Sequence, residues 1–117
     1  MACNMSTDPA DRFDALTSRG STATVFIRSD AAPTATVTAA TFNGAVVPID
    51  AAGKMSLPAA TLGTNVLNTT IERMNAGDDI QLVEDCGGGQ QVSLKTKFAG
   101  AAPGGADPVV SFRIHAS

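Results

Sequence analysis

The clearest structural signal in the sequence is the segment Asn65-Val-Leu-Asn-Thr-Thr-Ile-Glu-Arg-Met74. Its residues fall alternately on two sides, so that Leu67 and Ile71 share one face while Asn68 and Thr70 share the other. Side chains of a β-strand alternate in this way, and the β-branched residues favour a strand over a helix. The segment therefore predicts a strand with one buried apolar face and one polar face.

Further segments with the same two-residue period lie on both sides of this strand and are separated by turn residues. Together they predict about eight strands, at residues 22–28, 34–42, 45–47, 54–57, 65–74, 79–85, 91–98 and around 110–114. Between two of them, the pair Asn43-Gly44 is a strong hairpin signal, because a type I′ turn needs positive φ at both central residues. No helical segment separates the strands, which excludes parallel βαβ units and predicts an all-β, antiparallel sandwich.

The inward faces of these strands define the expected hydrophobic core. Its expected members are Ile27, Val37, Leu67, Ile71, Val92, Leu94, Phe98, Phe112 and Ile114. A chain of 117 residues buries about two-thirds of its unfolded surface, which is enough for one core. We therefore expect a single β-sandwich domain over residues 21–117, preceded by a tail and a short helix over residues 1–20.

The expected helix covers about residues 9–18 and rests on local end signals. Asp8 is a suitable N-cap, Pro9 suits the first helical position, and Gly20 suits a C-terminal cap. Phe13 and Leu16 are three residues apart and would share one face of the helix. Two large apolar residues bury little surface alone, so this helix is expected to lie against the main body.

Composition and charge exclude several classes of function. The net charge is −3 and the eight Lys and Arg residues are scattered, so there is no basic stripe for nucleic acid. No charge-free run is rich in Leu and Ile, so no transmembrane helix is predicted. One His and two Cys exclude zinc fingers and histidine-rich metal centres. No cofactor is expected.

The N-terminal residues leave two interpretations open. Met1-Ala2-Cys3-Asn4 lacks the basic and apolar regions of a signal peptide, so it is either a native cytosolic start or a mature segment without its leader. An Ala-Cys junction is what remains where a bacterial lipoprotein leader is cut, which makes Cys3 a candidate lipid anchor. A disulfide between Cys3 and Cys86 would stabilise the fold by about 4–5 kcal/mol in the chain-entropy model. Two free thiols are the favoured expectation, because two cysteines make no disulfide framework.

A group of turn residues between positions 40 and 67 resembles the bacterial immunoglobulin-like modules. The resemblance rests on Asn43-Gly44, on Asp50 and Gly53, and on Leu62-Gly63-Thr64-Asn65, which stand where such modules place their turns. The chain has no Trp for the core and no Tyr for a tyrosine corner, which are departures from the immunoglobulin pattern. The resemblance implies an immunoglobulin-like sandwich of about seven or eight strands, and it implies no catalytic residues.

The candidate binding residues are acidic side chains in the turns. Successive antiparallel strands alternate in direction, so the turns at 29–34, 50–53, 75–79 and 99–108 are expected at one end of the domain. They carry five of the eleven acidic residues, namely Asp30, Asp50, Asp78, Asp79 and Asp107. Converging carboxylates can bind Ca²⁺, but Asp is also a common turn residue and no contiguous calcium loop is present. We therefore predict a binding surface at this end and no metal site.

No set of residues for acid–base or nucleophilic catalysis is visible. His115, the only imidazole, lies two residues from the end of the sequence and is expected on a solvated face together with Arg113. Gly87-Gly88-Gly89 leads into a strand, whereas a phosphate loop leads into a helix, so it is interpreted as a hairpin turn. The chain is therefore not expected to be an enzyme.

These observations favour a non-catalytic binding or structural module of a bacterial extracytoplasmic protein, located in the periplasm, on the cell surface or outside the cell. It would bind a protein partner through its loops or an exposed sheet edge, because sheet edges accept added strands. The alternative is a sandwich that binds a small ligand, a carbohydrate or Ca²⁺, although the absence of Trp and Tyr argues against sugars. An enzyme of unrecognised type is the third possibility.

Overall fold

The computed structural model describes residues 3–8, 14–29, 36–72, 79–86, 93–97 and 109–117, and within these residues it is all-β, without a helix. The strands are β1 (Ser6–Thr7), β2 (Asp14–Thr17), β3 (Thr24–Ser29), β4 (Val37–Phe42), β5 (Ala45–Val46), β6 (Met55–Ser56), β7 (Gly63–Ile71), β8 (Asp79–Glu84), β9 (Ser93–Lys97) and β10 (Val109–Ala116). None of the described segments is a helix of the length and apolarity needed to cross a bilayer.

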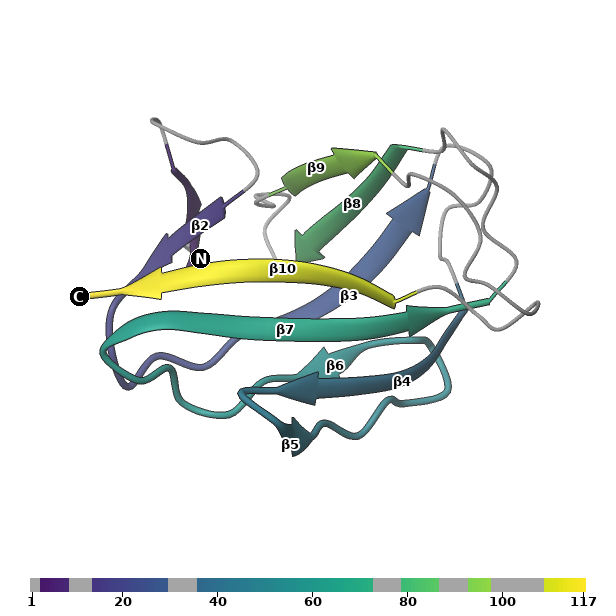
Figure 1. Ribbon diagram of the computed structural model, residues 1–117, viewed down its shortest axis with the longest axis horizontal. Helices are drawn as coiled ribbons and strands as arrows, with labels where there is room; N and C mark the ends of the chain where they lie inside the picture. Colours follow the sequence, from purple (N-terminus) through teal and green to yellow (C-terminus); the bar gives the residue numbers. More distant parts are fainter. Residues whose placement is uncertain (1–2, 9–13, 30–35, 73–78, 87–92, 98–108) are drawn as a thin grey trace.

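The strands form two sheets (Figure 1). One has six strands in the order β1-β2-β10-β7-β4-β5, and the other has four in the order β6-β3-β8-β9. Among the described strand pairs, β2 and β10 are parallel and the others are antiparallel. The expectation of mainly antiparallel pairing is therefore confirmed, with one parallel pair that the sequence did not predict.

The hydrophobic core lies between the two sheets. Ile27 and Leu82 enter it from the four-stranded sheet, and Leu67, Ile71 and Phe112 enter it from the six-stranded sheet. In β7 the burial alternates residue by residue from Asn65 onward, as its period-two sequence predicts. Two sheets that share one apolar core are consistent with a β-sandwich.

The expected core residues that the structure describes are all buried. They are Ile27, Val37, Leu67, Ile71, Phe112 and Ile114. Val92, Phe98 and the side chain of Leu94 lie outside the described residues. At the predicted hairpin, Asn43 has φ 52° and Gly44 has φ 86°, which are the positive values that a type I′ turn requires.

The predicted helix over residues 9–18 is wrong where the structure describes it, because Asp14–Thr17 form strand β2. Residues 9–13 lie outside the described residues. Strand β2 pairs with β10 on one side and with β1 on the other, and Ala15 becomes fully buried. These backbone hydrogen bonds and this burial outweigh the local capping signals, since helix propensity is a weak preference that tertiary contacts override.

Candidate functional site

The parallel pairing of β2 with β10 brings a carboxylate next to a guanidinium and an imidazole. Arg113 lies opposite Asp14 in the sheet, and His115 lies opposite Thr64 of β7. The His115 Nε2 is 2.8 Å from the Asp14 Oδ2, and the Arg113 Nε donates to the Asp14 Oδ1 at 3.2 Å. The Thr64 Oγ1 lies 2.9 Å from the His115 Nδ1. The four side chains therefore form one hydrogen-bonded cluster, which we call the Asp14 cluster.

The burial of Asp14 explains why it needs these partners. Its side chain is only 8% exposed, whereas those of Arg113 and His115 are 57% and 33% exposed. Burying a carboxylate is costly unless it is paired and hydrogen-bonded, and here each oxygen of Asp14 has its own partner. The expectation that Arg113 and His115 simply face solvent is therefore incomplete, because both side chains bind Asp14.

The order of groups from Thr64 through His115 to Asp14 matches that of a nucleophile, a base and an orienting carboxylate. Acyl transfer also needs a substrate cleft and donors for a developing oxyanion. Thr64 is exposed on a strand face, and neither the pocket beside Met5 and Phe42 nor the pocket beside Glu84 includes Thr64, His115 or Asp14 in its lining. The arrangement thus holds β2 on β10 and presents polar groups to solvent.

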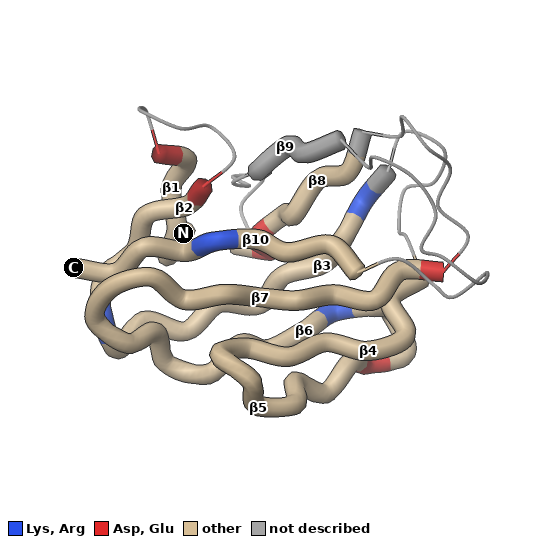
Figure 2. Tube along the Cα trace, in the orientation of Figure 1, with Lys and Arg blue, Asp and Glu red and all other residues tan. Residues whose placement is uncertain are grey.

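The Asp14 cluster lies at one end of a longer polar surface on the outer face of β7 and β10. This surface, called the β7–β10 strip, consists of the outward-facing residues Thr64, Val66, Asn68, Thr70, Val109, Ser111, Arg113 and His115. The Ser111 hydroxyl donates to the Asn68 side-chain oxygen across the two strands. In Figure 2 both strands are tan apart from the blue segment of Arg113. The strip is therefore extended, hydroxyl-rich and almost uncharged.

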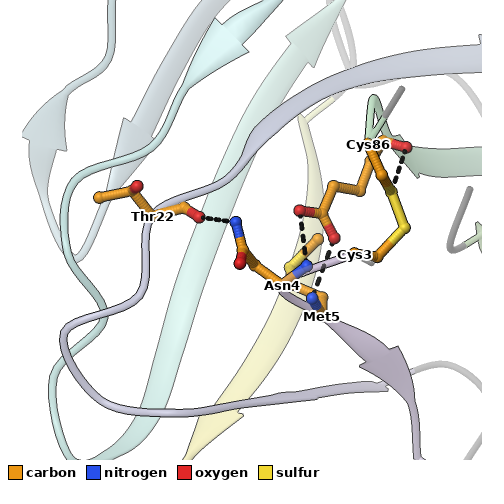
Figure 3. Close-up of a disulfide and its surroundings, with 6 residues drawn as sticks. Cys3, Asn4, Met5, Thr22 and Cys86 are labelled. Carbon is orange, nitrogen blue, oxygen red and sulfur yellow. Dashed lines mark hydrogen bonds between the residues drawn. A yellow bond between two sulfur atoms is a disulfide. The ribbon is translucent and has the colours of Figure 1, made fainter. Parts of the chain in front are cut away.

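A second polar site ties the N-terminal segment to the four-stranded sheet. Cys3 and Cys86 form a disulfide, so the expectation of two free thiols is wrong. The Glu84 carboxylate accepts hydrogen bonds from the backbone N–H of Asn4 at 3.0 Å and of Met5 at 2.9 Å, which are drawn as dashed lines in Figure 3. We call the disulfide and these hydrogen bonds the Glu84 anchor.

The disulfide also bears on the predicted lipid anchor. A disulfide and a thioether-linked lipid are alternative bonds of the same sulfur, so this form of the protein gives no support to lipidation of Cys3. The reason the pair forms is tertiary. Glu84 is only 2% exposed, and its carboxylate accepts hydrogen bonds from the backbone next to Cys3. These bonds hold Cys3 close to Cys86, with 5.0 Å between their Cα atoms.

An open pocket of about 410 Å³ adjoins the Glu84 anchor. It is lined by Asn4, Thr22, Ala23, Thr24, Ser56, Leu57, Glu84, Asp85 and Cys86. Asp85 also forms an ion pair with Lys54, and the hydrogen bond and charge of Asp85 raise the pKa of the Lys54 ammonium. The pocket thus combines two carboxylates, one of them deeply buried, with backbone and hydroxyl groups.

The predicted acidic end of the domain is described only at Asp50. Its carboxylate accepts the backbone N–H of Ala52 at 2.9 Å and of Lys54 at 2.8 Å, which is the turn-forming role of Asp. Asp30, Asp78, Asp107 and the side chain of Asp79 lie outside the described residues. The convergence of these five residues therefore stays a prediction.

Sequence reasoning missed both Asp14 and Glu84. For Asp14 no local signal was available, because its partners come from a strand far along the chain and the segment was expected to be helical. For Glu84 a signal existed, since the alternation in β8 places it on the same face as Ile80 and Leu82. A carboxylate on the inward face of a strand is expected to have a specific partner.

Comparisons of the chain with models of protein families, with curated proteins and with solved structures find no match.

Proposed function

We propose that this chain is a non-catalytic binding module of a bacterial extracytoplasmic protein, with an immunoglobulin-like sandwich fold, that binds a protein partner on the β7–β10 strip. The observation that carries the proposal is the strip itself. It runs along two of the longest strands of the molecule, β7 and β10, which lie side by side (Figure 1). A surface on such a scaffold changes little on binding, which lowers the entropic cost of association.

The side chains of the strip are already held in place before any partner arrives. Ser111 is hydrogen-bonded to Asn68, and His115 is held between Thr64 and the buried Asp14. Ordering flexible side chains costs about 0.5–1.5 kcal/mol each at an interface, so this ordering favours binding. The donors and acceptors that remain on these groups are available for a partner.

The composition of the strip favours a protein over a sugar as the partner. Val109 is 61% exposed and Val66 is half-buried, so apolar area is interspersed with hydroxyl and amide groups, as in protein interfaces. Sugar sites commonly stack the ligand on aromatic rings, and the chain contains no Trp or Tyr. Two of its five Phe, Phe42 and Phe112, are buried in the core.

The Cys3–Cys86 disulfide supports the extracytoplasmic location. Structural disulfides persist in the periplasm, on cell surfaces and outside the cell, and they are rare in the reducing cytosol. The turn residues around Asn43-Gly44 and Leu62–Asn65 support a relation to bacterial immunoglobulin-like modules. The disulfide would then take over part of the stabilising role that a larger core has in bigger domains.

A second binding mode is strand addition at β5, one of the two outer strands of the six-stranded sheet. Val46 in this strand is 82% exposed, which leaves an apolar side chain at an open sheet edge. However, β5 has only two residues, and Pro48 just beyond it lacks the N–H that a ladder needs. The strip is therefore the better candidate.

Site-specific photo-crosslinking in the native cell tests the proposal. A photoreactive phenylalanine analogue is placed at Ser111 on the strip, at Val46 on the β5 edge, or at Ala52 in the turn of Asp50. We expect a protein adduct of discrete mass from position 111 and none from the other two. An adduct from position 46 alone would indicate strand addition, and one from position 52 alone would favour the acidic end. Either result, or no adduct at all, would overturn the strip as the binding surface.

A further inference from the structure

The Glu84 anchor contains three groups that ligate metals. We infer that the reduced protein binds a Zn²⁺-like cation through the sulfurs of Cys3 and Cys86 and the carboxylate of Glu84. One ligand atom from each residue lies within 4.8 Å of the other two. Tetrahedral zinc, with ligand bonds of about 2.0–2.3 Å, separates neighbouring ligand atoms by about 3.3–3.8 Å. Once the S–S bond is broken, small shifts of these side chains are enough to enclose the ion.

The charges of the reduced site favour a cation. Two thiolates beside the Glu84 carboxylate would repel one another, and Asp85 adds a fourth acidic group at the same pocket. Within the described residues, Lys54 is a cation close to this site and it is paired with Asp85. A divalent ion bound by the thiolates and by Glu84 would cancel most of this negative charge. Thiolate ligands select Zn²⁺ over Ca²⁺ and Mg²⁺, which prefer oxygen.

The surroundings of the three ligands fit a metal site of this kind. The backbone N–H groups of Asn4 and Met5 hold the two oxygens of Glu84, as supporting hydrogen bonds hold the carboxylate ligands of metal sites. Glu84 and Cys86 line the open pocket of about 410 Å³, which provides an entry path and room for a water as fourth ligand. The expected coordination is therefore two sulfurs, one carboxylate oxygen and one water.

Binding requires reduction of the disulfide and release of protons. A phosphine reductant and one water molecule become the phosphine oxide, and the disulfide takes up the two electrons and two protons to give two thiols. Zn²⁺ then replaces the two thiol protons. The metal thereby restores a link between the N-terminal segment and β8 in conditions where the covalent link is absent. This inference does not depend on the proposed binding function.

Titration with Co²⁺, a spectroscopic substitute for Zn²⁺, tests the site. The protein is reduced with a phosphine, because dithiol reductants themselves bind these metals. We expect one equivalent of Co²⁺ to give sulfur-to-cobalt charge-transfer absorption and the strong visible bands of tetrahedral coordination, and Zn²⁺ to displace it. The oxidised protein should give neither signal. A reduced protein without charge-transfer absorption would overturn the inference.

Variants separate the three ligands from general metal attraction. Cys3→Ser lies in the N-terminal segment, leaves Glu84 in place and should reduce the charge-transfer band of the reduced protein by at least about half, because one of the two sulfur ligands is lost. Glu84→Gln should weaken Zn²⁺ binding by at least about tenfold. Removing a group that only supports the ligands of a metal site already lowers the metal affinity by about 10- to 100-fold. Asp50→Asn makes the same charge change outside the site and should leave the affinity unchanged.

X-ray absorption of the zinc-loaded reduced protein gives a readout that does not depend on variants. We expect two sulfur and two oxygen ligands, with Zn–S distances of about 2.3 Å. Equal affinity in Glu84→Gln and in the parent protein would show that Glu84 is not a ligand. A shell without sulfur would show that the cation binds elsewhere, and either result would overturn the assignment.

Discussion

The first and last strands of the chain are held in the molecule by different means. Strand β10 lies inside the six-stranded sheet between β2 and β7, and its burial alternates along its whole length. The segment from Cys3 to Thr7 has a two-residue strand and is fixed mainly by a disulfide and by the buried carboxylate of Glu84. Regular strands are stabilised by many equivalent contacts, whereas the N-terminal segment depends on a few specific ones.

The largest expected effect on stability concerns the regular strands. Phe112→Ala removes a side chain that is 2% exposed in the core and should lower the free energy of unfolding by about 3–5 kcal/mol. Val109→Ala in the same strand is the control, because Val109 is 61% exposed and surface changes usually stay within about 0.5 kcal/mol. The urea midpoints of both variants measure the difference. Equal midpoints would mean that β10 does not face the core.

The second effect concerns the N-terminal segment. Replacing both cysteines with alanine should cost about 2–5 kcal/mol, the usual cost of losing a native disulfide in a small domain. Because the disulfide is the covalent attachment of this segment, amide exchange should increase first in residues 3–7 and in β2, before the remaining strands. Hydrogen exchange measured by mass spectrometry checks this order. Uniform loss of protection would instead show that the segment is cooperative with the core.

A third prediction tests a buried polar residue of the regular part. Asn65 is fully buried, its amide donates to the backbone oxygens of Thr61 and Ile114, and its side-chain oxygen accepts from Asn43. Asn65→Ala removes these hydrogen bonds from a buried position and should cost at least about 1–3 kcal/mol. The half-buried Asn68→Ala in the same strand should cost less. A urea melt in which Asn68→Ala is the more damaging change would contradict this assignment.

The fourth prediction concerns the contact of β10 with β2, the strand that connects it to β1 of the N-terminal segment. Asp14→Asn removes the charge that Arg113 and His115 share, and it should cost about 1 kcal/mol because both partners are partly exposed. Asp50→Asn, at an exposed turn, is the matched control. The expected signature in NMR spectra is a change at β2 and at the His115 ring with the rest of the domain unaltered. Unaltered His115 signals would show that the pair is absent in solution.

The smallest effect is expected at Lys54, whose pKa is raised above its ordinary value of 10.5 by the hydrogen bond and charge of Asp85. A raised pKa in the folded state means that the pair stabilises the fold fully below the unfolded value and less as pH rises through the folded value. Lys54→Met should therefore lower stability slightly at neutral pH, and this deficit should shrink in strongly alkaline solution. A deficit that grows with pH would reverse the assigned sign.

The same contrast explains what the sequence could predict. The eight expected strands are present wherever the structure describes them, because each is a local pattern of alternating side chains or turn residues. The two missed strands, β1 and β2, have no such pattern. Strand β2 depends on its pairing with β10, about a hundred residues later, and β1 pairs with β2. The Asp14 cluster depends on the pairing of β2 with β10, so the local sequence of residues 9–18 does not predict it.

Glu84 shows an intermediate case. The alternation of β8 places it on the inward face, but its partners are backbone N–H groups of a segment with no predicted structure. The pairing of Cys3 with Cys86 follows from the same contact and was for that reason not predictable from spacing alone. Local periodicity thus predicts the sheets, while the attachment of the N-terminal segment depends on contacts between distant residues.

The Cys3–Cys86 bond also determines how the chain would respond to mechanical force. If residues 3 and 117 are pulled apart, tension passes through the disulfide directly to Cys86, and the loop between the two cysteines cannot lengthen. Only residues 87–117 can extend, to a length of about 100–110 Å at full stretch. With the bond reduced, the whole chain is in the line of force and can extend roughly four times as far. The disulfide therefore carries the applied force and limits how far the molecule can be stretched.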